Sequence, residues 1–405
     1  MRVIDCDSHF LEPVDWIEQA DPDLATQVPK TMTQAQFTEV VFAEFLAAIP
    51  EDQRPSYREL LSPGMRRRLA MSFGDDEQTE VLLSKIQKDT AADRPLAAFK
   101  PKGAHDAAER LEFCDAHGID VQLISPTVAL GMVVKVGREQ PHLRLRVIEA
   151  YNTWAARTVA GHTDRLIPVT YLDFADVSWA VRELTRMREA GSRAFLFPLD
   201  PSGGRSLADP ALDPVWAAAV DLGMIAFMHV GYGRVTVDPG WAKVGDRFDA
   251  TILARLVMTQ TQTIPQMALA TMIYGGVFDR HPGLTVVCQE FGLSWVEGWI
   301  DRIGPATRAG RPTGVAVFGW NLKRTPEEYL RHNIRFSPLQ GQRVDELVEA
   351  IGPEVAVFAT DYPHPEGSAS AAKQFGAQLA APRFDDDTRA RFFGGTMEEL
   401  LARGA

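Results

Sequence analysis

Two carboxylates and an imidazole stand at alternate positions near the start of the chain. Asp5, Asp7 and His9 belong to the strand-like run of residues 3–9. Side chains alternate across a strand, so these three are expected on one face and the residues between them on the other. Such groups are costly to bury unless they pair or bind a metal, and they suit zinc, manganese or iron. The run therefore indicates a metal site, with a turn that caps a helix at residues 7–9 as the alternative.

Similar groups follow three later apolar runs. His229, Glu290 and Asp361 each stand at or just after the end of a short apolar segment. Taken singly they have ordinary explanations: a hydrogen-bonded strand-end histidine, a carboxylate that caps the next helix, and a residue that starts a turn. Together with Asp7 and His9 they are groups that bind metals or transfer protons. Their meaning depends on whether the fold brings them to one place.

The segments that carry these residues alternate with amphipathic helices. Strand–helix alternation implies a parallel sheet. Eight such units predict an α/β protein with a closed (β/α)8 TIM barrel rather than an open doubly wound sheet, because no glycine-rich phosphate-binding sequence follows the first strand. The expected strands are residues 3–7, 121–124, 166–171, 194–197, 224–228, 284–289, 334–337 and 355–359.

The barrel prediction gives the polar strand ends a common location. Active sites of such barrels lie at the carboxyl ends of the strands. Asp7 and His9 would reach that rim from strand one, His229 from strand five, Glu290 from strand six and Asp361 from strand eight. Five suitable groups at one rim are hard to attribute to coincidence, so the sequence predicts a metal-dependent active site there.

Two stretches interrupt the regular alternation. Residues 11–102 contain helical patches between prolines and are predicted to form a helical insertion after strand one, as a cap or a partner surface. Residues 230–264 contain glycine-rich and aromatic loop signals and are predicted to form a lid-like insertion after strand five. No proline-rich boundary divides the chain cleanly, so residues 1–405 are predicted to form one domain.

Composition limits the classes of partner. The 405-residue chain has 42 Lys and Arg against 54 Asp and Glu, a net charge of −12, which argues against nucleic acid and anionic membranes. No apolar run reaches the roughly 20 residues that a membrane helix needs. The three cysteines are far apart and the N-terminus lacks a signal-peptide pattern, so a cytoplasmic location is expected.

Five short motifs stand at or near the ends of the predicted strands. They are Asp5-Cys6-Asp7-Ser8-His9, Pro126-Thr127, His229-Val230-Gly231, Glu290-Phe291-Gly292 and Thr360-Asp361-Tyr362-Pro363-His364. Together they resemble the amidohydrolase-related family of metal-dependent barrels, which includes hydrolases and the decarboxylases of the aminocarboxymuconate-semialdehyde and resorcylate types. The resemblance runs from residue 3 to about residue 370 outside the insertions, and the first and last motifs are the more specific.

The resemblance implies a single divalent metal ion, with zinc as the first choice and manganese or iron as alternatives. Its ligands would be Asp7, His9, His229 and Asp361. Strand four ends without a lysine that could bridge a second metal. The family's decarboxylases resemble one another in having a histidine at the end of strand six, where this chain has Glu290, and this difference favours hydrolysis.

The expected chemistry follows from the metal. A bound zinc ion can lower the pKa of water from about 15.7 to about 7, which makes a nucleophile available at neutral pH. Asp361 would take up the proton and deliver it to the leaving group, Glu290 would position water or substrate, and His229 would act in catalysis as a metal ligand. His364 is predicted either to support Asp361 or to be a surface turn residue.

The first-choice function is a metal-dependent hydrolase that cleaves a C–N, C–O or activated C–C bond of a small aromatic or unsaturated acid-type substrate. The alternatives are a nonoxidative decarboxylase and, more remotely, a catalytically silent barrel used for binding. Tyr232, Arg234, Trp241 and Trp295 could line the substrate pocket, although core packing of the tryptophans and a solvated arginine explain them equally well. Members of this family are commonly homodimers, so the resemblance also implies a dimer, with the helical insertion as a candidate interface.

Overall fold

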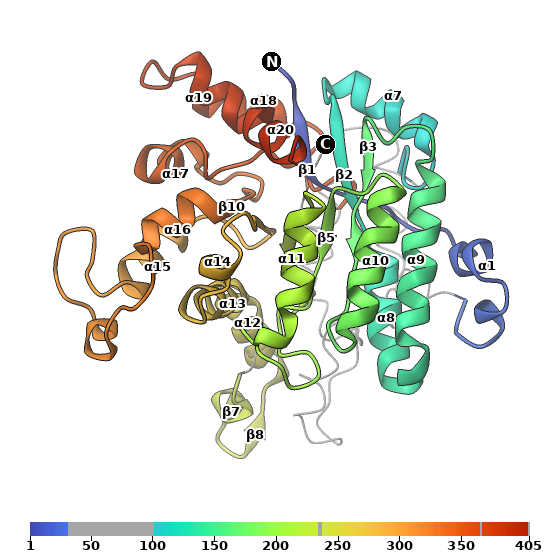
Figure 1. Ribbon diagram of the computed structural model, residues 1–405, viewed down its shortest axis with the longest axis horizontal. Coiled ribbons are helices and arrows are strands. Elements are labelled where there is room, and N and C mark those ends of the chain that lie inside the picture. Colours follow the sequence, from blue (N-terminus) through green and yellow to red (C-terminus); the bar gives the residue numbers. More distant parts are fainter. Residues whose placement is uncertain (31–100, 234–236, 365–366, 404–405) are drawn as a thin grey trace.

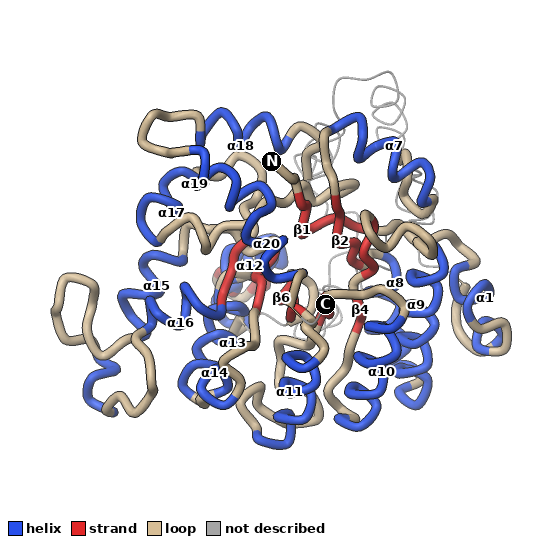
Figure 2. Tube along the Cα trace, turned by 45° about the horizontal axis from the view of Figure 1, so that its top comes forward, coloured by secondary structure: helices blue, strands red, loops and turns tan. Residues whose placement is uncertain are grey.

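Parallel strands enclose the centre of the molecule, and helices cover them on the outside (Figures 1 and 2). The computed structural model describes residues 1–30, 101–233, 237–364 and 367–403. One sheet has the order β1-β2-β3 and the other has the order β10-β9-β6-β5-β4, with every neighbouring pair parallel. The strands are β1 Ile4–His9, β2 Val121–Ser125, β3 Leu166–Pro168, β4 Thr170–Tyr171, β5 Ala194–Leu196, β6 Ile225–His229, β9 Val286–Gln289 and β10 Ile334–Phe336.

The two sheets join through a strand that is interrupted at one residue. β3 pairs with β2 and β4 pairs with β5, and only Val169 lies between β3 and β4. The Val169 N–H donates to the Ile124 carbonyl (3.0 Å), while the Leu172 N–H donates to the Leu196 carbonyl (3.0 Å). Residues 166–171 therefore act as the single third strand that the sequence predicted.

The eighth predicted strand, residues 355–359, closes the barrel. The Phe336 N–H donates to the Val355 carbonyl (2.8 Å), and the Val357 N–H donates back to Phe336 (3.0 Å). On the other side the Cys6 N–H donates to the Phe358 carbonyl (3.0 Å). This extended segment thus bonds to β10 and β1 without forming a regular strand of its own, and the predicted (β/α)8 barrel is confirmed.

The strands are buried on both faces, as is typical of parallel sheets covered by helices. All six residues of β1 are buried, including its three polar ligand candidates. Apolar strand residues pack against the inner faces of the helices, which places the hydrophobic core between the two layers. The helices are α1 Trp16–Ala20, α7 Ala107–His117, α8 Val128–Glu139, α9 Arg144–Thr158, α10 Val177–Glu189, α11 Asp213–Asp221, α12 Ala250–Gln260, α13 Thr263–Tyr274, α14 Val277–Arg280, α15 Val296–Ile303, α16 Pro326–Asn333, α17 Val344–Ile351, α18 Ala371–Leu379, α19 Asp386–Ala390 and α20 Thr396–Leu401.

The predicted insertions are only partly described. Of the insertion at 11–102, the described part includes the short helix α1, which lies against α9 through the Trp16–Tyr151 ring contact and the Arg146–Asp21 ion pair (2.6 Å). The insertion at 230–264 contains the hairpin of β7 Lys243–Val244 and β8 Arg247–Phe248, followed by α12. The second insertion is therefore partly helical rather than entirely loop.

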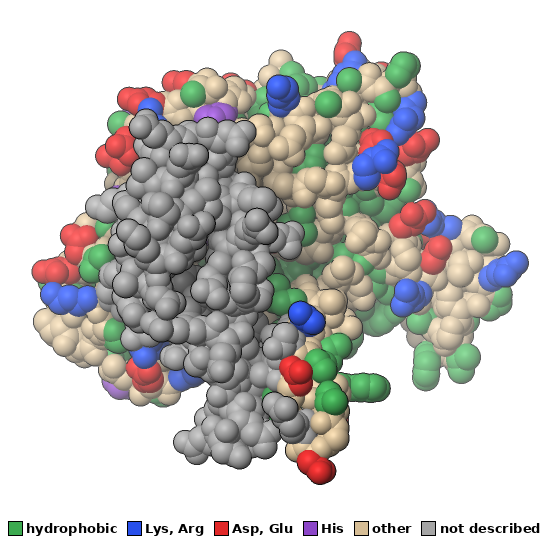
Figure 3. All heavy atoms as spheres, turned by 180° about the vertical axis from the view of Figure 1, so that it is seen from behind, with side chains coloured by type: hydrophobic (Ala, Val, Ile, Leu, Met, Phe, Trp, Pro, Cys, Tyr) green, Lys and Arg blue, Asp and Glu red, His purple; other side chains and the backbone are tan. Residues whose placement is uncertain are grey.

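The surface carries charges of both signs. Acidic and basic side chains are interspersed on the face shown in Figure 3, outside the atoms drawn in grey. None of the helices in the described parts of the chain combines the length and the apolar character that crossing a membrane requires.

Candidate active site

Three ligand atoms meet at the carboxyl ends of β1 and β6. His9 Nε2 lies 3.4 Å from Asp7 Oδ1 and 3.2 Å from His229 Nε2, and His229 Nε2 lies 3.4 Å from the same Asp7 oxygen. Atoms that coordinate one ion at about 2.1 Å lie roughly 3.0 to 3.5 Å from one another. Asp7 Oδ1 is buried and accepts no hydrogen bond from the described residues. The triangle of Asp7, His9 and His229 therefore fits a single divalent metal ion.

Two further carboxylates approach this triangle from the other strand ends. Asp361 Oδ1 lies 3.5 Å from His9 Nε2, and Glu290 Oε2 lies 3.4 Å from His229 Nε2. Their side chains are only 8% and 6% exposed. Buried carboxylate oxygens in this position need a cation or a proton nearby. All five predicted rim residues thus converge on one site.

The backbone is strained where it delivers these two carboxylates. Glu290 and Asp361 have φ values of 58° and 55°, in the left-handed region that residues with a Cβ rarely adopt. Gly367 packs directly against the Asp361 carbonyl, where a Cβ would collide with the oxygen. Strain of this kind persists only where the surrounding structure enforces it, and it is concentrated at functional sites.

His364 lies inside the cluster that the five rim residues form, rather than on the surface. Its Nδ1 is 2.8 Å from Asp361 Oδ1 and 3.5 Å from Glu290 Oε1. Its ring stacks on that of His9 with the centroids 3.9 Å apart. Of the two roles that the sequence left open, the geometry matches the partner of Asp361.

The ionisable groups of the site shift one another's pKa values. Burial and Glu290 raise the pKa of the Asp361 carboxyl well above its usual range. Burial alone would lower the pKa of His364, but Asp361 and Glu290 raise it well above its usual range. Burial and His364 lower the pKa of His9 to about 4, which keeps this imidazole neutral as a metal ligand must be. The three carboxylates Asp7, Glu290 and Asp361 would be neutralised by one divalent cation and one proton on His364.

Asp5, the third polar residue of the first strand, binds neighbouring strands instead of the cluster. It accepts hydrogen bonds from the Thr360 N–H (2.9 Å), the Thr360 hydroxyl (2.6 Å) and the Gln122 amide (2.8 Å). Burial raises the pKa of its carboxyl to about 7. Asp5 therefore ties β1 to β2 and to the closing segment. The signal that could have revealed this role is Gln122, a polar residue within an apolar strand.

Arg110 is another structural residue that the sequence analysis missed. This buried side chain on α7 donates to the His9 carbonyl (2.5 Å), to the Gly103 carbonyl (2.7 Å) and to Gln122 Oε1 (3.3 Å). Its contact with His9 is through the backbone. Arg110 thus holds the end of β1 in place and leaves Nε2 of the His9 imidazole free for the site, while Nδ1 lies 3.1 Å from the Pro126 carbonyl.

The predicted pocket residues lie in different surroundings. The Tyr232 hydroxyl donates to the Leu172 carbonyl (2.7 Å), and the Trp295 indole donates to the Phe291 carbonyl (3.1 Å). Trp295 also packs against Trp299 and Phe336 in the core. Trp241 is 76% exposed on the second insertion, and Arg234 lies outside the described residues.

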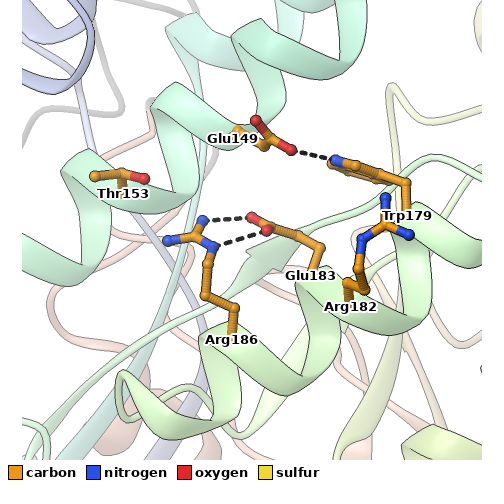
Figure 4. A pocket seen from close by; sticks show the side chains of 6 residues that line it. All are labelled: Glu149, Thr153, Trp179, Arg182, Glu183 and Arg186. Atoms are coloured by element: carbon orange, nitrogen blue, oxygen red, sulfur yellow. Dashed lines mark hydrogen bonds and ion pairs between the residues drawn. The ribbon is translucent and has the colours of Figure 1, made fainter.

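A groove between α9 and α10 lies in the outer helical layer, away from the strand ends (Figure 4). Its polar groups are largely paired with one another. The Trp179 indole donates to Glu149 (2.5 Å), and Arg186 binds both oxygens of Glu183 at 2.5 and 2.8 Å. The Trp179–Glu149 hydrogen bond joins the two helices, whereas the Arg186–Glu183 pair lies within α10. Groups paired in this way are not poised for catalysis.

Glu12, three residues after His9, is a buried carboxylate outside the ligand cluster. Its two oxygens accept hydrogen bonds from the Thr127 N–H (3.2 Å) and the Val128 N–H (2.7 Å) at the start of α8. Burial raises the pKa of Glu12 from its usual 4.5 to about 7. The folded protein therefore holds a proton on Glu12 between these pH values that the unfolded chain releases.

This proton makes the contribution of Glu12 to stability depend on pH. Because the folded-state pKa is raised, stability is lost as the pH rises from 4.5 to 7, by up to about 3 kcal/mol. Glu12→Gln cannot ionise, so its unfolding free energy relative to the unsubstituted protein should rise by that amount between pH 5 and pH 8. Urea unfolding of both proteins at each pH measures this difference. A difference that stays constant with pH would show that Glu12 titrates normally.

The comparisons with known proteins agree with this architecture. A sequence model of the amidohydrolase family matches residues 4–403, almost the whole chain. The chain belongs to the amidohydrolase family. It is accordingly a metal-dependent enzyme of that superfamily, as the five motifs indicated.

Individual relatives of this amidohydrolase are distant. A 2-amino-3-carboxymuconate-6-semialdehyde decarboxylase from Dictyostelium discoideum is 27% identical over 302 residues, which cover 73% of this chain and 76% of the relative. An amidohydrolase from Mycobacterium avium subsp. paratuberculosis K-10 superposes with a TM-score of 0.67 at 21% identity and 99% coverage of both chains. A 5-carboxyvanillate decarboxylase from Novosphingobium aromaticivorans DSM 12444, complexed with manganese, gives 0.61 at 19% identity, covering 99% of this chain and 96% of the other. The structural matches show a shared fold.

Proposed function

We propose that this amidohydrolase is a nonoxidative decarboxylase of a small aromatic or unsaturated carboxylic acid. The observation that carries the proposal is the position of His364, whose Nδ1 lies between Asp361 and Glu290 at the mouth of the barrel. The relatives named as decarboxylases support it. This function replaces the hydrolase that the sequence favours. The main argument against decarboxylation is that Glu290, and not a histidine, stands at the end of strand six, and His364 supplies the imidazole that this position lacks.

The metal would be held by Asp7, His9, His229 and Asp361. When bound, it would polarise the substrate carboxylate and a neighbouring hydroxyl group and fix their orientation. Zinc remains the proposed ion on its preference for nitrogen and oxygen ligands, and manganese is the alternative that the 5-carboxyvanillate decarboxylase complex supports. Metal analysis of the purified protein distinguishes the two.

The side chains of the site would transfer one proton to the substrate. During decarboxylation the bond between the carboxylate and the substrate carbon breaks, carbon dioxide leaves, and the electron pair stays on that carbon. The carbon then takes the proton from His364 Nδ1, and His364 regains a proton from solvent. Asp361 and Glu290, at 2.8 and 3.5 Å from this nitrogen, would orient the ring and stabilise its protonated form.

Isotope labelling tests the proposal directly. Protein loaded with Zn²⁺ or Mn²⁺ is incubated with a panel of hydroxybenzoic acids, amides and lactones in D₂O and, separately, in H₂¹⁸O. Decarboxylation releases carbon dioxide and places one deuterium on the carbon that lost it. Hydrolysis instead places ¹⁸O in the product and releases no carbon dioxide.

The hydrolase remains the second candidate because of one specific feature. Glu290 Oε1 is buried and, apart from its ion pair with His364 at 3.5 Å, accepts no hydrogen bond within the described residues, so it can accept one from a water molecule or a polar substrate group. If ¹⁸O enters the product, Glu290 becomes the residue that positions water, and the decarboxylase proposal is withdrawn.

A further inference from the structure

At the start of helix α8, the N-cap residue is not the residue whose side chain makes the capping hydrogen bonds. Thr127 is the N-cap of this 12-residue helix, yet its hydroxyl makes no capping hydrogen bond. An N-cap threonine normally accepts a hydrogen bond from a backbone N–H of the first turn. Here Glu12 does this work, because its carboxylate accepts from the N–H groups of Thr127 and Val128. The Thr127 hydroxyl is therefore available for another partner.

That partner is the imidazole in the active site. Thr127 Oγ1 lies 2.9 Å from His364 Nε2, while Nδ1 of the same ring faces Asp361 and Glu290. A hydroxyl can both donate and accept a hydrogen bond. The hydroxyl can therefore pair with Nε2 in either tautomer of the ring, and this contact fixes the direction in which Nδ1 points.

We infer that Thr127 is a positioning residue that fixes the His364 ring with Nδ1 directed at the reacting group. Its hydroxyl is free for this task because Glu12 caps α8 from a distant part of the chain. The inference deepens the proposed function and rests on it for the role of Nδ1. The contact between the two side chains is a separate observation and is tested separately.

The test uses two substitutions that differ in the hydroxyl. Thr127→Val keeps the shape of the side chain and removes the hydroxyl, whereas Thr127→Ser keeps the hydroxyl. Thr127→Val should lower kcat by about 10- to 100-fold with KM and metal content unchanged, the range typical when a hydrogen-bond partner of a metal-binding histidine is removed. Thr127→Ser should restore turnover of the same substrate close to that of the unsubstituted protein. A serine variant as impaired as the valine variant, or a valine variant with unchanged kcat, overturns the inference.

Nitrogen NMR of the ring gives a readout that needs no substrate. The chain has nine histidines, and the His364 signals in ¹⁵N-histidine-labelled, metal-free protein are identified by their loss in His364→Gln. Thr127→Val should shift the His364 ring signals and Thr127→Ser should not. Unmoved signals in the valine variant contradict the inference whichever reaction the enzyme performs, so its failure is distinct from failure of the proposed function.

Two controls separate positioning from folding. Thr325 is an exposed N-cap whose hydroxyl does accept from the Glu328 N–H (3.3 Å), so Thr325→Val should lower the melting temperature and leave kcat and the His364 signals unchanged. If Thr127→Val folds poorly, the double variant with His364→Gln decides. Thr127→Val should have little further effect on kcat in that background, because both changes remove one interaction. Fully additive effects would overturn the inference.

Discussion

Asp361→Asn is expected to lower turnover by about 10³-fold or more while the protein stays folded. The substitution removes a negative charge that faces both the metal ligand His9 (3.5 Å) and the proton-carrying His364 (2.8 Å). Asparagine has nearly the same shape, so the loss would come from charge rather than packing. Turnover with saturating metal and a circular dichroism spectrum measure the two halves of the prediction.

In the absence of metal, the same substitution should stabilise the folded protein. Asp361 is one of three buried carboxylates in the cluster, and burial together with Glu290 disfavours its ionised form. Metal-free Asp361→Asn should therefore unfold at a higher temperature than the metal-free unsubstituted protein. Asp345→Asn is the matched control, since this buried carboxylate pairs with Arg343 and Arg383 away from the site and should lose stability without loss of turnover. Substantial residual activity in Asp361→Asn would contradict the role of Asp361.

Removing the metal is expected to abolish activity and to destabilise the fold. A ligand that binds only the folded state stabilises it by about 2.7 kcal/mol at 100 times its Kd. The effect should be clear here, because removal leaves Asp7, Glu290 and Asp361 without their cation. Thermal unfolding with and without a chelator, followed by addition of Zn²⁺ or Mn²⁺, measures the loss and its recovery.

His229→Ala provides the control for metal removal. It deletes one corner of the ligand triangle, so the variant should contain little metal and its melting temperature should not respond to the chelator. His281→Ala alters a histidine that pairs with Asp213 in the helical layer (3.1 Å) and should keep the metal response of the unsubstituted protein. An identical response to chelator in His229→Ala would mean that the metal binds elsewhere.

Much of the fold was predictable because its signals are local. Short apolar runs and the helices between them appear directly in the sequence, and a barrel of parallel strands places all carboxyl ends at one rim. That rule alone predicts one common location for five residues that are far apart in the chain, namely Asp7, His9, His229, Glu290 and Asp361. The eighth strand shows the limit of such signals, since residues 355–359 are extended and bonded on both sides but form no regular strand of their own.

The orientation of side chains beyond the strand ends could not be predicted in the same way. Glu290 and Asp361 reach the site through left-handed backbone conformations that residues with a Cβ adopt only rarely. Asp5 has the same strand periodicity as Asp7, yet it bonds to Thr360 and Gln122 because those strands lie beside it in the closed barrel.

The amino-acid sequence by itself determined which groups stand at the barrel rim and that they suit a divalent metal, because strand periodicity and ligand chemistry are properties of short segments. Only the tertiary structure decided that His364 enters the cluster, that Thr127 contacts it and that Glu12 caps α8. The contacts of Thr127 with His364 and of Glu12 with the start of α8 join segments separated by more than one hundred residues. Their geometry depends on how loops leave the strands and pack against one another, which no local pattern records.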